Sequence, residues 1–199
     1  MTPEILRPDY QVILQWIGPG ASVLDLGCGD GELLELLVRK RGARAQGIEI
    51  SEQAIFQCVA KGLSVFHEDI DHGLTGYGER SFDFVILNQS LQQVKQLDTV
   101  LQEALRVGRQ VIVGFPNFAH LRARSQIFFL GKTPVTPALP YQWHDTPNLH
   151  FLSLVDFVSY CRARRISIDR TAWIGRTRRV ILLPNLFAVT GLFLVSMPL

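Results

Sequence analysis

The chain has 199 residues, of which 47% are hydrophobic and 19% are charged, and its formal net charge is +2. This length and apolar content predict a single folded domain over residues 1–199 and exclude a disordered or collagen-like chain. The charge is uneven, because residues 162–179 hold seven arginines and one aspartate whereas residues 180–199 hold no charged residue. The arginine-rich segment therefore carries +6, which leaves −4 for the rest of the chain.

Along the chain, short apolar runs alternate with helical patterns. The strands that we expect cover residues 22–26, 45–50, 63–67, 82–87, 110–115, 166–173 and 186–195. The helices that we expect cover residues 32–41, 52–61, 97–107 and 153–164. Ser51 is a predicted N-cap, Gly42 closes the first helix, and Ser153 with Asp156 has capping-box spacing. This order predicts an α/β fold with a mostly parallel, twisted, seven-stranded sheet, helices on both faces and a C-terminal antiparallel strand pair.

Three features bear on the cellular compartment. The cysteines are widely spaced and odd in number: Cys28, Cys58 and Cys161. They predict neither a disulfide framework nor a metal site, and with the polar stretch at residues 1–10, which lacks a secretory apolar core, they favour the cytoplasm. The charge-free tail has 20 residues, but Pro184-Asn185 and Gly191 interrupt it. We therefore expect two short buried strands around a turn and no membrane span.

A glycine-rich loop, VLDLGCGDG, follows the first expected strand. Its glycines alternate and open a helix: Gly27, Gly29 and Gly31. The spacing differs from the G-x-G-x-x-G of dinucleotide sites, and Asp25 precedes it by two residues. A carboxylate beside the loop disfavours a pyrophosphate and favours a cationic ligand. S-adenosylmethionine carries a sulfonium and an ammonium group and has no phosphate.

Polar residues end the other expected parallel strands as well. Glu49, 24 residues after Asp25, stands where an acid accepts hydrogen bonds from ribose hydroxyls. Asp69-Ile70 suits adenine, and Asn88 faces the same crevice. Over about residues 20–116 this set resembles the Rossmann-like class I S-adenosylmethionine-dependent methyltransferases. The resemblance implies a site for S-adenosylmethionine or S-adenosylhomocysteine made by Asp25, Gly27, Cys28, Gly29, Gly31, Glu49, Ile50, Asp69, Ile70 and Asn88.

Catalytic residues are less evident. Residues 88–94, NQSLQQV, lack the N/D-P-P-Y/F motif of base methyltransferases, and no cysteine lies beside a candidate base. The long loop at residues 132–150 holds four of the ten prolines, and ordered loops of this length are usually functional. Candidate bases lie in or near it: His120, Tyr141, His144, Asp145 and His150. For each of them we favour the simpler role of a hydrogen-bonding loop residue or a surface histidine.

Three further segments are distinctive. They are FPNFAH at 115–120, LPYQWHDTPNLH at 139–150, and Asp156-Phe157. They are similar to segments shared by the MetW family of methionine-biosynthesis proteins, so the likeness spans nearly the whole chain. Members commonly have an aromatic residue where His144 stands and tryptophan where Leu121 stands, which disfavours His144 as a base. The resemblance implies association with homoserine O-acyltransferase (MetX), whose activity such a subunit supports.

Three functions are therefore open. The chain is an S-adenosylmethionine-binding subunit of the acyltransferase, a small-molecule methyltransferase, or an RNA methyltransferase. The arginines at 162–179 form a solvated face, a protein contact or phosphate contacts, and the net charge of only +2 disfavours nucleic acid. Because the charged fraction is low, we expect another protein to cover much of the surface, either the acyltransferase or a second copy of this chain.

Overall fold

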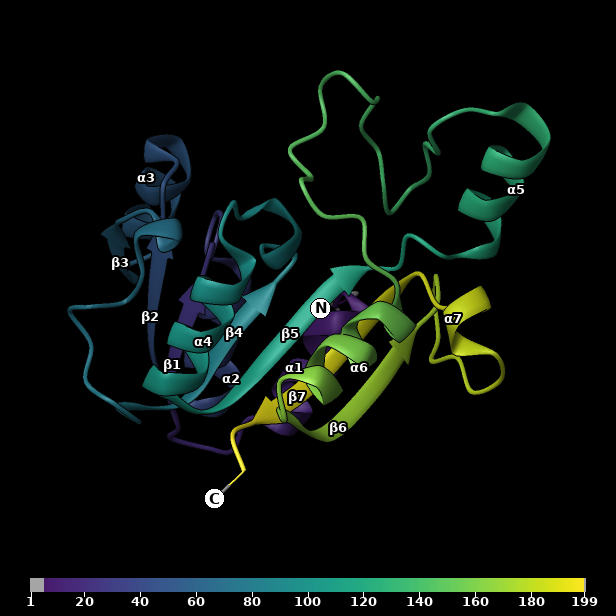
Figure 1. The fold of residues 1–199 in the computed structure, drawn as a ribbon. Coiled ribbons are helices and arrows are strands. Elements are labelled where there is room, and N and C mark those ends of the chain that lie inside the picture. The colour runs from purple at the N-terminus through teal and green to yellow at the C-terminus, as the bar shows by residue number, and fades with distance from the viewer. Residues whose placement is uncertain (1–5, 199) are drawn as a thin grey trace.

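The computed structural model describes residues 6–198, so the first five residues of the polar N-terminal stretch lie outside it. Its centre is a seven-stranded sheet of order β3-β2-β1-β4-β5-β7-β6 (Figure 1). The strands are β1 (Ser22–Leu26), β2 (Arg44–Glu49), β3 (Ser64–His67), β4 (Phe82–Asn88), β5 (Gly108–Pro116), β6 (Ser167–Ile174) and β7 (Thr190–Ser196). Strands β1 to β5 are parallel, and β7 is antiparallel to both β5 and β6. The predicted sheet and its closing antiparallel pair are confirmed.

The helices include all four that the sequence predicts. They are α1 (Pro8–Trp16), α2 (Glu32–Arg41), α3 (Glu52–Ala60), α4 (Leu97–Val107), α5 (Leu121–Leu130), α6 (Leu154–Ala163) and α7 (Pro184–Phe187), with 3-10 turns η1 (Ile70–His72) and η2 (Leu91–Gln93). Ser51 caps α3 by accepting a hydrogen bond from the Ala54 amide, and Ser153 and Asp156 form the complete capping box of α6. Helices α1, α5 and α7 were not expected.

Both faces of the sheet are covered, because successive residues of a strand point to opposite sides. On one face, Val85 and Leu87 of β4 share a core with Phe157 of α6 and with α4. On the other face, Ile86 shares a core with Ile13 of α1 and with α2. Figure 1 shows α4 and α6 together in front of the sheet. Burial on both faces explains the nearly continuous apolar run of this strand.

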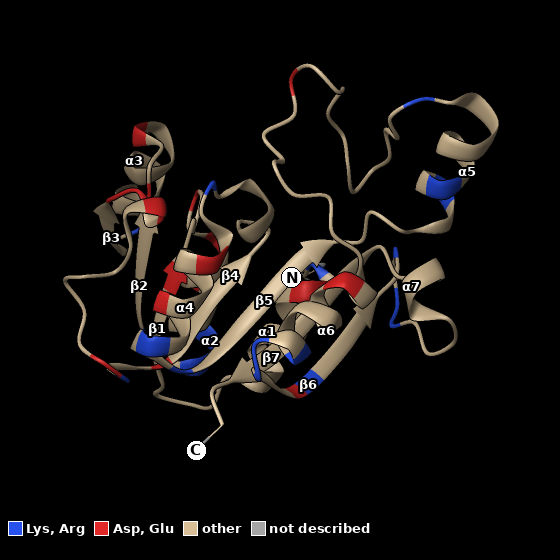
Figure 2. Ribbon diagram, in the orientation of Figure 1, with Lys and Arg blue, Asp and Glu red and all other residues tan. Residues whose placement is uncertain are grey.

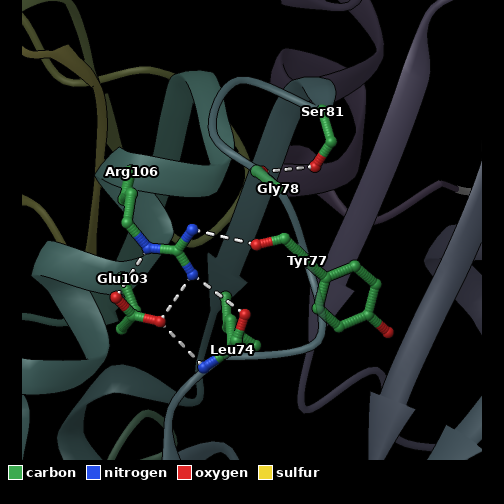
Figure 3. A network of polar contacts seen from close by, with 6 residues as sticks. All are labelled: Leu74, Tyr77, Gly78, Ser81, Glu103 and Arg106. Carbon is green, nitrogen blue, oxygen red and sulfur yellow. Dashed lines mark hydrogen bonds and ion pairs between the residues drawn. The ribbon is translucent and has the colours of Figure 1, made fainter.

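The connection between β3 and β4 is held against α4 by Arg106 (Figure 3). Its guanidinium donates to the carbonyl oxygens of Leu74 and Tyr77 at 2.9 Å each. It also forms two hydrogen bonds of 2.8 Å with the carboxylate of Glu103, which in turn accepts from the Leu74 amide at 3.1 Å. The network therefore fixes the segment that follows η1, and η1 itself contributes Ile70 and Asp71 to the lining of the cavity described below.

The charge-free tail departs from the prediction. Residues 180–183 bend across the surface, where Ile181 is 88% exposed, and α7 follows them. Only Thr190–Ser196 is a strand, buried between β5 and β6. Strand β7 occupies the position between β5 and β6, and β6 is the edge strand of the sheet. The interior of the sheet therefore has no position left for residues 180–183. The prediction of two buried strands within the tail was wrong in its first half. Within residues 6–198, no helix combines the length and apolar character needed to cross a bilayer.

Candidate functional site

A cavity of about 530 Å³ opens at the carboxyl ends of the central strands. It lies where the strand order reverses between β1 and β4, the position at which open α/β sheets bind ligands. The structure brings nine of the ten predicted cofactor residues into its lining: Asp25, Gly27, Cys28, Gly29, Glu49, Ile50, Asp69, Ile70 and Asn88. Gly31 is outside the lining. We call this space the first cavity.

The glycine loop turns through left-handed backbone at Gly27, Gly29 and Gly31, with φ of 76°, 57° and 77°. Gly29 lines the first cavity, and a Cβ added to it would meet no atom within 4 Å. Gly31 packs instead, because a Cβ there would lie 2.6 Å from Leu63 Cδ1 and 2.8 Å from Cys58 Sγ. Gly29 therefore leaves space for a ligand, whereas Gly31 permits close packing against Cys58 of α3.

Asp25 is a buried carboxyl with an unusual environment. Only 3% of the residue is exposed, and its side chain has no hydrogen bond to any residue that the structure describes. Burial, followed by the negative charge of Glu49, raises its pKa to about 7. A buried carboxylate without a partner is costly. A cationic or hydrogen-bond-donating ligand in the cavity would relieve that cost.

Glu49 ends β2 and is held firmly by backbone amides. Its Oε2 accepts from the Gly29 amide at 2.8 Å, and its Oε1 accepts from the amides of Ile50 and Ser51 at 2.9 Å each. A carboxylate has about four acceptor positions. One position is therefore left for a first hydroxyl of a ribose, and a second hydroxyl requires one backbone donor to be released.

Two buried polar atoms in the lining have no hydrogen-bond partner among the described residues, namely Asn88 Oδ1 and Ser90 Oγ. The side-chain amide nitrogen of Asn88, Nδ2, donates a hydrogen bond to Asp9 Oδ2 at 3.1 Å. Buried polar atoms are normally paired. An unpaired acceptor and an unpaired hydroxyl suit a ligand that carries both N–H donors and acceptor atoms, so the residues present fit S-adenosylmethionine.

A second cavity of about 470 Å³ adjoins the first and shares the lining residues Arg7, Gln89 and Gln93 with it. Arg7 is paired with Asp9 at 2.7 Å. Gln89 has a φ of +66°, a conformation that is strained for a non-glycine residue and is often found at functional sites. Sequence reasoning missed Arg7 and Gln89. The place of Gln89 directly after Asn88 was the signal that could have found it.

The candidate bases do not converge on the first cavity. Tyr141 lines the second cavity, whereas His120 lines a separate space of about 30 Å³, where burial and the nearby Arg122 lower its pKa. His150 forms a hydrogen bond of 2.9 Å with the Val94 carbonyl. His144 and Asp145 are exposed and line neither cavity. Of these five candidates, Tyr141 lines the cavity that adjoins the first, and His150 contacts Val94 in the lining of the first cavity.

The seven arginines of residues 162–179 are all exposed. They contact different elements. Arg164 forms an ion pair with Asp98 of α4 at 2.7 Å, and Arg179 donates a hydrogen bond to Gln15 of α1 at 2.7 Å. Arg176 lines the second cavity. The segment is therefore exposed on this chain, with local contacts at several points.

The fold is that of the class I S-adenosylmethionine-dependent methyltransferases. One solved structure of a methyltransferase from Thermotoga maritima, described as a possible histamine N-methyltransferase, has a TM-score of 0.66 at 16% identity, over 96% of this chain and 89% of that one. One from Archaeoglobus fulgidus has a TM-score of 0.69 at 16% identity, over 96% and 91%. The sequence model of the family "Methionine biosynthesis protein MetW" matches residues 7–195. The chain belongs to the MetW family, as the motifs predicted.

Two curated relatives show how the chain compares with longer proteins. The bifunctional methionine biosynthesis protein MetXA/MetW of Rhodopirellula baltica is 37% identical over 173 residues, which are 82% of this chain and 28% of that protein. A ribosomal protein L11 methyltransferase of Burkholderia vietnamiensis is 31% identical over 111 residues, 53% of this chain and 36% of that protein. The chain thus spans about a third of the length of these relatives.

Proposed function

We propose that this chain is a cytoplasmic S-adenosylmethionine-binding subunit that associates with homoserine O-acyltransferase and supports its activity. Its family assigns it to methionine biosynthesis, and the relative from Rhodopirellula baltica carries MetXA and MetW in one protein. The observation that supports cofactor binding most directly is the buried Asp25 carboxyl, which has no hydrogen-bond partner within residues 6–198 and lies in the same cavity as Glu49. Such a cavity repels phosphate and attracts a cation.

Each wall of the first cavity has a part in this proposal. Asp25 faces the positive charge of the cofactor, and Glu49 accepts from its ribose. Asp69 and Ile70 hold the adenine, and Asn88 lines the wall at the end of β4. The bound cofactor would supply a sulfonium methyl group and a signal of pathway output, because S-adenosylmethionine is made from methionine.

Calorimetric titration with S-adenosylmethionine tests the cofactor. We expect saturable binding that Glu49→Gln weakens by about 10- to 100-fold, the range for a charged hydrogen bond. Glu52→Gln is the matched control, since Glu52 is exposed, lies three residues away and does not line the cavity. Absence of binding to the wild-type chain, or equal binding by Glu49→Gln, would contradict the proposal.

Reconstitution with purified homoserine O-acyltransferase tests the partner. We expect the acyl-transfer rate to rise when the chain is added and to change again when S-adenosylmethionine is titrated. An acyl-transfer rate that does not change when the chain is added would refute the subunit role. A rate that rises with the chain but does not change at saturating S-adenosylmethionine would refute only the proposal that the chain reports the cofactor level.

The second cavity favours one other function, a small-molecule methyltransferase. It has the volume of a metabolite site and adjoins the first cavity at Arg7, Gln89 and Gln93. A methyl acceptor held there by Tyr141 and Gln92 would reach the cofactor across that boundary. Transfer of labelled methyl groups to a metabolite pool, lost in Glu49→Gln, is the result that this function predicts, and the absence of any labelled product would argue against it.

A further inference from the structure

Helix α5 exposes its apolar side chains. Phe128 is 82% exposed and Phe129 is 76% exposed, and Ala123 is the one buried residue of the helix. A helix of ten residues is marginal in water unless a face of it is packed. Figure 1 shows α5 and the loop after it standing away from the sheet, on the side where α7 lies. The helix therefore has an apolar surface that this chain does not cover.

A second apolar segment lies beside the start of α5. Residues 181–183 are exposed, and α7 follows them with Phe187 also exposed. Asn117, which precedes α5, donates to the carbonyl oxygens of Asn185 at 3.1 Å and Ala188 at 2.9 Å. These bonds fix the two segments to one end of the molecule. We call residues 121–130 and 181–187 together the projecting surface.

The segments that form and flank the projecting surface are basic, up to the exposed Asp145 in the loop after α5. Residues 117–144 and 171–199 contain six basic residues and no acidic residue: Arg122, Arg124, Lys132, Arg176, Arg178 and Arg179. Since the chain totals +2, the remainder carries −4. Figure 2 shows blue and no red on α5 and on the segment that leads to α7. Among the residues that the structure describes, none of the six forms an ion pair with a carboxylate.

We propose that the projecting surface is the docking site for the acyltransferase, which presents an apolar patch bordered by carboxylates. This inference rests on the proposed function, which supplies the partner. Aromatic residues and arginines are enriched in protein interfaces, and an apolar centre with a cationic border requires an acidic counterpart. A second copy of the chain is disfavoured, because a two-fold contact would bring six like charges against six.

Binding of the whole chain to purified homoserine O-acyltransferase tests this site. We expect the double variant Phe128→Ser, Phe129→Ser to weaken binding by at least about tenfold. Phe56→Ser is the matched control, because Phe56 is 72% exposed on α3, at the opposite end of the sheet beside β3. Arg122→Glu with Arg124→Glu should weaken binding most at low salt, where charge attraction is strongest. Since all four residues are exposed, unchanged thermal melting should show that the variants fold.

The outcomes separate this inference from the proposed function. If the wild-type chain binds the acyltransferase and the double variant binds equally well, or if Phe56→Ser weakens binding as much, the docking site is wrong and the subunit role stands. If the wild-type chain does not bind, both fail. Self-association that the double variant abolishes would assign the surface to a second copy, and wild-type binding to anionic vesicles that the variant loses would assign it to a membrane. Either result would overturn the proposal.

Discussion

Asp25 and Glu49 bring two carboxylates from neighbouring strands into one cavity. Asp25 lies opposite Gly47 in the register of β1 and β2, two residues before Glu49. Three backbone amides satisfy Glu49, whereas the Asp25 carboxyl has no hydrogen bond to a described residue. The pair therefore combines a fixed acceptor with an unsatisfied charge, an arrangement that costs stability in the free protein and favours a cationic ligand.

Asp25→Asn should stabilise the free protein at high pH. The pKa of Asp25 is raised to about 7 in the folded protein. Between the pKa of the unfolded chain and pH 7, the Asp25 carboxyl is therefore protonated in the folded state and ionised in the unfolded state, and the stability of the folded state falls as the pH rises. Asparagine removes that penalty. We expect the free energy of unfolding to rise by up to about 4 kcal/mol near pH 8 and to change little near pH 4. Urea denaturation at both pH values measures this, and a loss of stability near pH 8 would contradict it.

Cofactor affinity should rise with pH through neutrality. A cationic ligand favours the ionised form of Asp25, whose pKa of about 7 in the free protein must then fall in the complex. Between pH 6 and pH 8 the affinity for S-adenosylmethionine should increase by up to about tenfold. Asp25→Asn should flatten this profile, which calorimetry can follow. A profile that keeps its slope in Asp25→Asn would show that another group is responsible.

The sheet and the first cavity could be predicted because their signals are local. The central strands β1, β4 and β5 are largely buried and therefore mostly apolar, and residues that follow parallel strands meet at one edge of the sheet. Helix α5 could not be predicted in this way, because its apolar side chains face away from the core and show no burial pattern. The prediction of a buried strand at residues 181–183 was wrong for the same reason, because these apolar side chains are exposed. An apolar run predicts burial without showing whether the chain itself or a partner provides it.

The two cavities illustrate the same limit on a smaller scale. Asp25 and Glu49 end strands and belong to a recognisable pattern. Arg7 and Gln89 reach the boundary between the cavities from the N-cap of α1 and from the turn after β4, and neither was predicted. Only the packing of α1 against the sheet brings Arg7 to that boundary, so its place depends on tertiary structure.

Replacing two glycines of the loop should separate packing from ligand access. Gly31→Ala combines a φ of 77° with contacts of 2.6 Å to Leu63 and 2.8 Å to Cys58, and we expect it to destabilise the chain by about 2–4 kcal/mol. Gly29→Ala has the strain without the contacts and should cost about 1 kcal/mol. Its methyl group would border the first cavity and weaken cofactor binding. Thermal melting and calorimetry measure both effects, and equal losses of stability would contradict this distinction.

Arg106→Lys should loosen the connection between β3 and β4. Lysine cannot reach both carbonyl oxygens and the Glu103 carboxylate at once. Because the group is partly exposed, we expect a loss of about 1–2 kcal/mol. Arg106 lowers the pKa of Glu103, so this stability is present at neutral pH and is lost as the pH falls through the folded pKa of Glu103. The difference in melting temperature between the wild type and the variant should therefore be larger at neutral pH than at acidic pH. A difference that does not change with pH would argue against the network.

His150→Ala should release the long loop from the wall of the first cavity. The Gln92 carbonyl accepts from the amides of Leu149 at 2.9 Å and His150 at 3.1 Å, and the His150 side chain adds its bond to the Val94 carbonyl. Val94 lines the first cavity, so this anchor joins the cofactor site to the loop that follows α5. Losing one such bond should speed hydrogen exchange at residues 139–150 by about fivefold. His144→Ala, an exposed change in the same loop, is the control. In the wild type, S-adenosylmethionine should slow exchange in this loop, and His150→Ala should reduce that protection. A loop that exchanges alike in both variants would show that His150 does not anchor it.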